Sequence, residues 1–335
     1  MLVVYDELYG GHLRGIPHPE SPERVEVVAA SLSGRAQFLN ARDASDQEIE
    51  RVHSAGYLET VRREVAAMRG HAGYLSTGDT VVDERSLDVA RRAAGGAILA
   101  AQTAYERNTA VFAIVRPPGH HAESTRGMGF CVFNNAAIAA RSIQAQTGAR
   151  ALIVDFDYHH GNGTQAVSGK GLSYVSTHGY PAYPGTGGAD ENYALPQRDA
   201  IVNVPLPPHG FGTEPFVALW ETLLPRVAQH VRPDILIVSA GFDYAAGDPV
   251  GDLGVAVSAA SHLAATIERV ARTYCGGRTV YVLEGGYDAH VLAQSVACVI
   301  DAHDTRSAAQ SGADAAAVPQ RQRALIERIG EVLRA

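Results

Sequence analysis

Residues that could carry out chemistry are concentrated in the segment 155–165, which reads DFDYHHGNGTQ. It directly follows the apolar run ALIV, so an apparently buried strand ends in carboxylates and imidazoles. Asp157 and His159 are two residues apart, and at a strand end this spacing directs both side chains to the same side. A carboxylate oxygen and an imidazole nitrogen suit zinc or another divalent cation. Alternatively, Asp155 and Asp157 could cap a helix, with His159 as an ordinary loop residue.

Three further apolar runs also end in ionisable side chains. AVFAIV is followed by RPPGHH with His120 and His121, ILIVSA is followed by Asp243, and TVYVLEGG is followed by Tyr287. In open α/β sheets, the loops beyond the carboxyl ends of the strands form the ligand site, so these side chains are expected at one edge. A catalytic zinc takes about three protein ligands and keeps a position for water, and Asp243 could be the third ligand.

The remaining polar residues indicate acid–base chemistry. Histidine titrates closest to neutral pH, so His120 and His121, if they are not ligands, could transfer protons. Asp155 and Asn162 could fix the tautomers of imidazole rings in the site. The Tyr287 hydroxyl could donate a hydrogen bond to a developing oxyanion, although an ordinary turn tyrosine has the same local sequence.

The elements that must position these residues alternate along the chain. Short apolar runs predict strands, and several are apolar throughout, which is typical of strands covered on both faces of a parallel sheet. The expected strands are residues 2–5, 110–115, 151–156, 172–177, 201–206, 235–240 and 279–284. Segments with a helical apolar period separate them, at 21–32, 84–106, 133–146, 214–231 and 258–274. The alternation predicts an α/β domain with a mostly parallel sheet flanked by helices.

The domain organisation is expected to be simple. Residues 1–304 form a single catalytic domain, and residues 305–335 form a linker and a C-terminal amphipathic helix. The linker is the Ala-rich, polar stretch 305–320, and the helix reads RALIERIGEVLRA.

Composition excludes several classes of protein. The net charge of −8 over 335 residues argues against nucleic-acid binding and mildly favours a cationic substrate. Three cysteines without a CxxC pair suit a reducing compartment. The sequence shows no signal-peptide pattern and no apolar run long enough for a membrane span. We therefore expect a cytoplasmic protein that binds neither nucleic acid nor membranes, and that could form a homo-oligomer.

Taken together, the motifs resemble the zinc-dependent histone deacetylase family and its bacterial relatives, which include the acetylpolyamine amidohydrolases. In the family's order they are HPESPERV, RPPGHHA, GMGFCVFNNAAIAA, VDFDYHHGNGTQ, YPGTGG, NVPLPP, SAGFDYAAGDPVG and LEGGY. The resemblance implies an arginase-like α/β fold. It also implies a zinc-dependent deacetylase that removes acetyl or other short acyl groups from an acylated amine, with acyl-lysine favoured.

The resemblance also implies catalytic roles. The positions that match the zinc ligands are Asp157, His159 and Asp243. His121 matches the general base that later protonates the leaving amine, and His120 matches its electrostatic partner, paired with Asp155. Asn162 matches a position that holds Asp or Asn, and Tyr287 matches the residue that polarises the scissile carbonyl.

Other positions match the substrate tunnel of the family. Phe130 and Tyr183 correspond to its aromatic walls, with Tyr183 in place of the more usual Phe. Gly129 matches a carbonyl that receives the substrate amide, and Asp79 matches a rim aspartate that holds the substrate backbone. Arg24 matches an arginine lining an inner cavity proposed for acetate release.

The resemblance implies a structural monovalent cation, K⁺, beneath the zinc. Its ligands would be the side chains of Asp155 and Ser176 and the carbonyls of Asp157, His159 and Thr177. The stretch AVSGKGLSY is shorter than usual, which leaves a second cation site open. The loop after YPGTGG lacks the family's glycine-rich run, which leaves the choice of substrate open.

Alternative functions follow from the same residues. DELYGGHL resembles the acetylpolyamine branch and HPESPERV the protein-deacetylase branch, so an acetylpolyamine or other small-molecule amidohydrolase is the main alternative. A non-catalytic acyl-lysine binding protein is a more distant one, and the complete set of ligands, histidine pair and tyrosine argues against it. A dimanganese arginase-like hydrolase is disfavoured by the single Asp-x-His pair.

Overall fold

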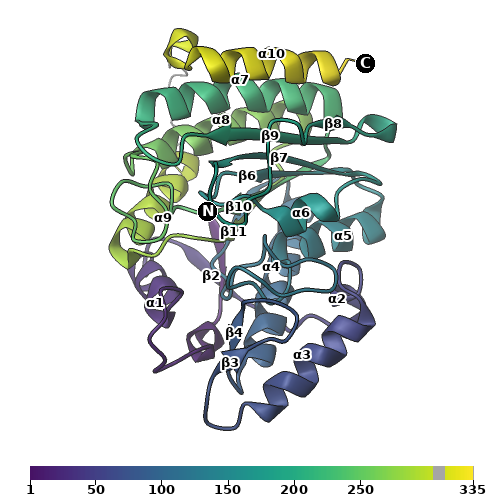
Figure 1. Cartoon of the computed structure of the whole chain (residues 1–335), viewed down its shortest axis with the longest axis vertical. Coiled ribbons are helices and arrows are strands. Elements are labelled where there is room, and N and C mark those ends of the chain that lie inside the picture. Colours follow the sequence, from purple (N-terminus) through teal and green to yellow (C-terminus); the bar gives the residue numbers. More distant parts are fainter. Residues whose placement is uncertain (305–313, 335) are drawn as a thin grey trace.

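The computed structural model describes residues 1–304 and 314–334, and its centre is a nine-stranded sheet between helical layers (Figure 1). In order across the sheet, the strands are β2 (Gln37–Asn40), β1 (Leu2–Tyr5), β5 (Ala110–Ala113), β11 (Thr279–Leu283), β10 (Ile235–Ala240), β6 (Ala151–Asp155), β7 (Leu172–Gly179), β9 (Ala200–Leu206) and β8 (Tyr193–Ala194). Neighbouring strands are parallel, except that β8 is antiparallel to β9. The predicted fold class, a mostly parallel sheet flanked by helices, is confirmed.

Helices cover both faces of the sheet. One layer contains α1 (Pro22–Ser31), α9 (Ala289–Asp304), α8 (Ala259–Tyr274) and α7 (Thr213–Val231), which pack side by side in this order. The other contains α4 (Ser86–Arg107) and α5 (Asn135–Thr147), which pack against each other and against strands in the middle of the sheet. The remaining elements are α2 (Asp46–Ile49), α3 (Ala55–Ala67), α6 (Asn162–Ala166), α10 (Gln320–Val332), the hairpin of β3 (Gly73–Tyr74) and β4 (Val81–Val82), and the 3₁₀ turns η1 (Glu7–Gly11), η2 (Pro196–Arg198) and η3 (Ala315–Ala317).

The sheet centre explains why the site forms at one edge. Every residue of β5, β11, β10 and β6 is buried, as expected for strands between two helical layers. Because these four strands are parallel, the loops that leave their carboxyl ends meet at the same edge. Those loops contain the histidine pair, the DFDYHH motif, Asp243 and Tyr287.

Several elements differ from expectation. All seven predicted strands are present, β1 and β10 with the predicted bounds and the other five with shifted ends. Strands β2 and β8 were missed because their side chains are largely exposed and form no apolar run. Helices α3 and α9 were missed too. The predicted C-terminal helix begins earlier, at Gln320, and ends at Val332. In the predicted linker, residues 305–313 lie outside the described residues.

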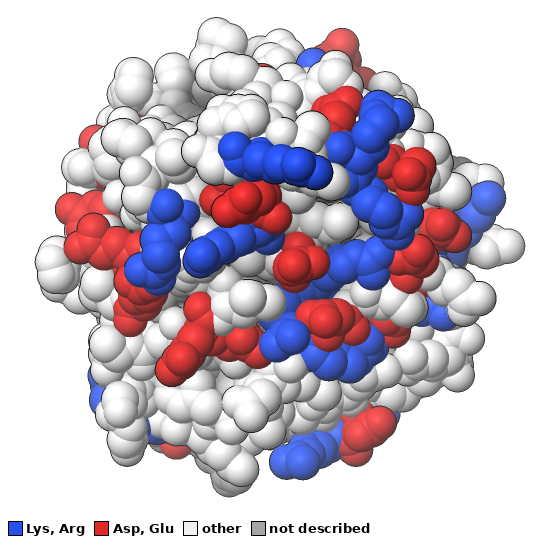
Figure 2. Space-filling model, turned by 90° about the horizontal axis from the view of Figure 1, so that it is seen from below, with Lys and Arg blue, Asp and Glu red and all other residues white. Residues whose placement is uncertain are grey.

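The charged surface shows no field of one sign on the face drawn in Figure 2, where acidic and basic side chains alternate. Ion pairs between neighbouring helices include Arg91 with Asp46 and Arg62 with Asp46. No helix in the described part of the chain is long and apolar enough to cross a membrane.

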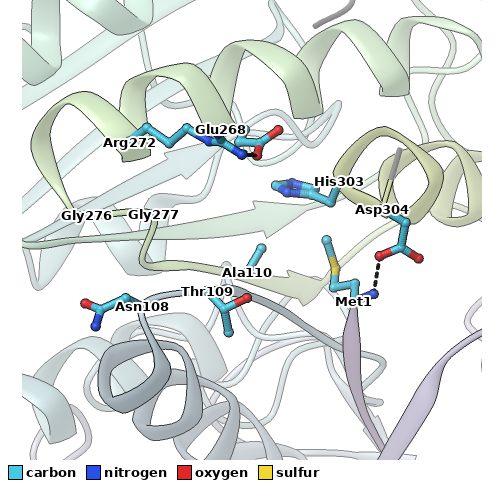
Figure 3. Close-up of a pocket in the computed structure, with 10 residues that line it drawn as sticks. All are labelled: Met1, Asn108, Thr109, Ala110, Glu268, Arg272, Gly276, Gly277, His303 and Asp304. Carbon is cyan, nitrogen blue, oxygen red and sulfur yellow. Dashed lines mark hydrogen bonds and ion pairs between the residues drawn. The ribbon is translucent and has the colours of Figure 1, made fainter. Parts of the chain in front are cut away.

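A cavity of about 440 Å³ lies at the opposite edge of the sheet, beside the amino ends of β1, β5 and β11 (Figure 3). Arg272 in its wall pairs with Glu268, and the Met1 amino group pairs with Asp304. His303, which also lines it, hydrogen-bonds with the hydroxyl of Tyr281. The charged groups of this cavity thus satisfy one another, and none of the predicted catalytic residues lines it.

Candidate metal centre and active site

The three predicted metal ligands lie together beyond the carboxyl ends of β6 and β10. Ligand atoms of Asp157, His159 and Asp243 all lie within 4.8 Å of one another, and all three residues are buried. Strand β6 ends at Asp155, so Asp157 and His159 belong to the loop that follows it. Since β10 pairs directly with β6, the loop after β10 brings Asp243 to the same place. His159 Nδ1 lies 2.9 Å from Asp243 Oδ2 and 3.3 Å from Asp157 Oδ1.

The electrostatics of this group fit a divalent cation. Burial and the neighbouring charge of Asp157 raise the pKa of Asp243 to about 7. Burial also opposes ionisation of Asp157, but His120 and His159 lower its pKa. Two buried carboxylates so close together need a compensating positive charge, and two carboxylates with one imidazole form a donor set that zinc accepts. Gly241 makes room for them, because a Cβ at that position would overlap the Asp157 carboxylate.

The histidine pair lies beside the metal ligands, and its two rings have different hydrogen-bond partners. The ring centroids of His120 and His121 are 4.0 Å apart. His120 Nδ1 is 3.1 Å from Asp155 Oδ2, and His121 Nδ1 is 2.9 Å from Asn162 Oδ1. The Asn162 amide nitrogen donates to Glu123, so its oxygen is the atom that faces the ring. Because that oxygen can only accept, His121 Nδ1 carries the hydrogen and its Nε2 is the basic atom.

These surroundings give the two rings opposite charge preferences. Burial opposes the cationic form of His120, but the carboxylates of Asp157 and Asp155 raise its pKa to about 10. Burial, followed by the nearby positive charges of His120 and His159, lowers the pKa of His121 well below its usual value. These surroundings therefore favour a neutral imidazole at His121 next to a cationic one at His120.

A cavity of about 260 Å³ opens above these groups and brings the predicted substrate residues together. Its lining consists of Asp79, His121, Gly129, Phe130, His159, Tyr183, Val250 and Tyr287. The Tyr183 ring stands perpendicular to that of His121, with ring centroids 5.1 Å apart. The ring centroids of Phe130 and Tyr287 are 5.7 Å apart. Aromatic faces thus form much of the wall.

The mouth of the cavity is held by the Asp79 carboxylate. Asp79 Oδ1 accepts the Gly129 N–H at 2.9 Å, and Oδ2 accepts the Tyr183 hydroxyl at 3.0 Å. Phenylalanine, the residue that the resemblance leads one to expect at position 183, could not make the second bond. The tyrosine therefore joins the rim aspartate to the tunnel wall.

Tyr287 follows β11 and lines the same cavity as His121 and the metal ligand His159. Burial and the charge of Asp243 raise the pKa of Tyr287 well above its usual value, so the phenol stays protonated and can donate a hydrogen bond. The Arg24 guanidinium lies 4.9 Å from the centroid of its ring. Arg24 is buried, pairs with Glu20 at 2.8 Å and donates to the carbonyl oxygens of Glu284 and Gly286.

Comparison with known proteins identifies the family. The family model described as the histone deacetylase domain matches residues 18–303. The chain belongs to the histone deacetylase family. The expected resemblance is thereby confirmed, and the site described above lies inside the matched region.

Individual members of the histone deacetylase family are similar over most of this chain. Histone deacetylase 15 of Arabidopsis thaliana is 38% identical, over 85% of this chain and 52% of its own length. The chain therefore spans about half of that relative. The histone deacetylase-like amidohydrolase of Pseudomonas aeruginosa is 34% identical, over 87% of this chain and 78% of its own. The crystal structure of the HDA15 HD domain superposes with a TM-score of 0.85 and 34% identity, covering 99% of this chain and 93% of that one.

Three of the five residues predicted to hold K⁺ in this histone deacetylase family member lie on adjacent strands, and the other two, Asp157 and His159, lie in the loop after β6. Asp155 and Ser176 are paired positions of β6 and β7, and Thr177 follows on β7. All three are buried. The Ser176 hydroxyl lies 2.8 Å from His178 Nδ1, and Asp155 Oδ1 accepts the N–H of Asp157. Their role in cation binding stays a prediction.

Sequence reasoning missed several residues that hold the deacetylase-family site. Glu284 Oε2 accepts the N–H groups of Gly119 and His120 at 2.6 and 3.1 Å, and burial raises the pKa of Glu284 to about 7. The Tyr174 hydroxyl donates to Asp155, which thus holds two partners besides the backbone. A signal for Glu284 was present, since an acidic residue ends the otherwise apolar run TVYVLE.

Proposed function

We propose that this chain is a zinc-dependent hydrolase that removes acetyl or other short acyl groups from an acylated primary amine, with acyl-lysine favoured. The main observation in support is that His121, His159 and Tyr287 line one cavity of about 260 Å³, next to the buried group of Asp157, His159 and Asp243. Membership of the histone deacetylase family supports the class of reaction.

The proposed chemistry divides the work between the metal and the chain. Zinc held by Asp157, His159 and Asp243 would supply Lewis acidity toward the acyl oxygen and the attacking water. His121 accepts the water proton at Nε2, since Nδ1 is engaged by Asn162. The same ring then donates that proton to the departing amine. Burial, together with the cationic His120 that is held by Asp155, keeps His121 neutral at the start of the cycle.

Tyr287 completes this scheme. Its phenol stays protonated and reaches the cavity, so it can donate a hydrogen bond to the oxygen on which negative charge develops. The proposed substrate enters between Phe130 and Tyr183, whose aromatic faces suit a methylene stem. Burying such a stem contributes about 0.8 kcal/mol per CH₂. The Gly129 carbonyl and the Asp79 carboxylate are the groups proposed to receive the substrate's N–H groups.

Further assignments belong to the same proposal. We propose that K⁺ binds to the side chains of Asp155 and Ser176 and to the carbonyls of Asp157, His159 and Thr177. We also propose that the acetate product leaves through an inner cavity lined by the buried Arg24. A cytoplasmic location and the absence of nucleic-acid partners rest on composition alone.

A second candidate function is acetylpolyamine hydrolysis. The observation that favours it is the Asp79 carboxylate at the cavity mouth, because a secondary ammonium of a polyamine could pair with it. The acyl chemistry would be unchanged, and only the group beyond the tunnel would differ.

A comparison of kcat/KM tests the proposal. Zinc-loaded protein would be assayed on acetyl-lysine peptides, acetylputrescine and acetylspermidine, with Asp243→Ala prepared in parallel as the control for contaminating activity. We expect hydrolysis of the peptides to be fastest and to be absent in the control. Faster hydrolysis of acetylpolyamines would favour the second candidate. Binding of acetyl-lysine without turnover of any substrate would show a non-catalytic binding protein.

A further inference from the structure

Asp248 is a buried carboxylate that accepts backbone hydrogen bonds from two separate loops. Its side chain lies in the segment between β10 and α8 and is 7% exposed. Oδ1 accepts the N–H groups of Val250 at 2.9 Å and Gly251 at 3.1 Å. Oδ2 accepts those of Tyr287 at 2.6 Å and Asp288 at 3.3 Å. One side chain therefore joins its own loop to the loop that follows β11.

Both loops form walls of the 260 Å³ cavity. Strands β10 and β11 are neighbours, with Ala240 paired to Leu283 at their carboxyl ends, so the two loops leave the sheet side by side. Val250 from one loop and Tyr287 from the other line the cavity. The Asp248 carboxylate thus bridges the backbones of these two walls, in addition to the Phe242 N–H, which donates to the Gly285 carbonyl at 3.1 Å nearer the sheet.

The backbone before Tyr287 needs such a restraint. Gly286 adopts φ = +115°, a conformation that glycine reaches readily, and the two adjacent glycines make the segment intrinsically flexible. The Gly285 N–H is held by Asp157 Oδ2 at 2.8 Å, and the Gly286 carbonyl is held by Arg24 Nε at 2.5 Å. The N–H of Tyr287 itself is held by Asp248.

We propose that Asp248 is a positioning residue for catalysis, which sets the Tyr287 phenol and the Val250 wall at the spacing that the reaction requires. The inference rests on the hydrolase function proposed above and adds to it a residue that acts through Tyr287. A misplacement of about 1 Å can cost roughly 10²-fold in rate, so loss of this restraint should reduce turnover more than substrate binding.

The test compares Asp248→Asn with a matched control. Asparagine has nearly the same size but only one acceptor oxygen, so two of the four N–H groups lose their acceptor. The control is Asp252→Asn in the same loop. Asp252 also accepts backbone N–H groups, from Gly247 at 3.1 Å and Gly254 at 2.7 Å, without a bond to the Tyr287 loop.

A double-mutant cycle with Tyr287→Phe then separates positioning from general destabilisation. We expect Asp248→Asn to lower kcat about 10- to 100-fold with a smaller change in KM, and Asp252→Asn to change neither by more than about threefold. In the Tyr287→Phe background, Asp248→Asn should lower kcat only slightly further. An equal loss in both backgrounds, or an equal loss in Asp252→Asn, would overturn the proposal.

A second measurement does not depend on activity. Protein containing 3-fluorotyrosine gives a ¹⁹F signal for Tyr287, identified because Tyr287→Phe lacks it. We expect Asp248→Asn to shift or broaden that signal and Asp252→Asn to leave it in place. An unchanged signal in Asp248→Asn overturns the proposal even if the wild type hydrolyses none of the acyl amines, which would separately refute the proposed function. Should Asp248→Asn not fold, Asp248→Glu keeps the charge, and its longer side chain should displace the same signal.

Discussion

At the scale of single residues, identical side chains perform different tasks because their partners differ. His120 and His121 are adjacent in sequence, yet one faces a carboxylate and the other an amide oxygen. The carboxylates of Asp157 and Asp155 outweigh burial and favour a cation at His120, whereas burial and the charges around His121 favour a neutral ring. The division into a neutral base and a cationic partner thus comes from neighbours and not from residue type.

His121 should be required for turnover and dispensable for metal binding. Proton transfer by a positioned side chain typically contributes roughly 10²–10⁴-fold, so His121→Ala should lose about that much in kcat. Zinc content, measured on the same preparation, should stay at the wild-type level, whereas Asp243→Ala should lose its zinc. Loss of zinc in His121→Ala would instead identify this histidine as a ligand.

Tyr287→Phe should fold, keep its zinc and bind a hydroxamate, yet turn over slowly. A hydrogen bond to the developing oxyanion is strongest in the transition state, and removing such a donor typically costs roughly 10²–10³-fold in kcat. KM should change far less. Steady-state kinetics on an acetyl-lysine peptide and an acetylpolyamine would measure both constants. Near wild-type kcat on every accepted substrate would mean that Tyr287 is an ordinary turn residue.

At the scale of elements, α10 covers the β9 side of the sheet. It packs against α7 and β9 (Figure 1), with the apolar side chains of Leu325, Ile326 and Ile329 buried beneath it. The Gln322 amide donates to the Pro205 carbonyl of β9. This helix therefore contributes to the fold of the domain even though none of its residues lines the cavity.

Ile326→Ala should lower the free energy of unfolding by about 2–5 kcal/mol, because it removes a buried side chain and leaves a void. Its exposed neighbour Arg323 provides the control, and Arg323→Ala should stay within about 0.5 kcal/mol of the wild type. Urea unfolding followed by circular dichroism would measure both. Equal stabilities of the two variants would show that α10 does not stabilise the domain.

At the scale of the whole molecule, several buried or half-buried histidines make the fold sensitive to acid. Burial lowers the pKa of His53, His12 and His303 to about 4 in each case. His53 shows why: its Nε2 accepts the Asn134 N–H, so its Nδ1 must carry the hydrogen that is donated to the Glu123 carbonyl. Protonation would add a hydrogen where an acceptor is needed.

The sign of the pH dependence follows from this arrangement. The unfolded chain protonates His53 below pH ~6.5, whereas the folded chain resists until about 4, so the contribution of His53 to stability is fully present above ~6.5 and is lost as the pH drops toward 4. Because of His53 alone, the free energy of unfolding should decrease by about 2 kcal/mol between pH 7 and pH 5. His53→Gln should therefore show a shallower decline over this range in urea unfolding. An unchanged decline would mean that His53 is not the titrating group.

Much of the fold and of the candidate site could be predicted from local patterns in the sequence. Strands apolar on both faces need two covering layers, which is typical of a parallel sheet, and a parallel sheet places the residues after each strand at one edge. Asp157 and His159, two residues apart after such a strand, therefore had to lie close together. The order of residues along the chain was sufficient for these conclusions.

Which side chains hold these residues was decided by the tertiary structure. Asp248 reaches Tyr287 across 39 positions, Tyr183 reaches Asp79 across 104, and Glu284 reaches Gly119 across 165. These contacts depend on the strand order, in which β11 lies between β5 and β10 although it comes last in sequence. A periodic pattern indicates which face of a strand is buried, but it carries no information about the neighbouring strand. Only the packed sheet could therefore determine these pairs.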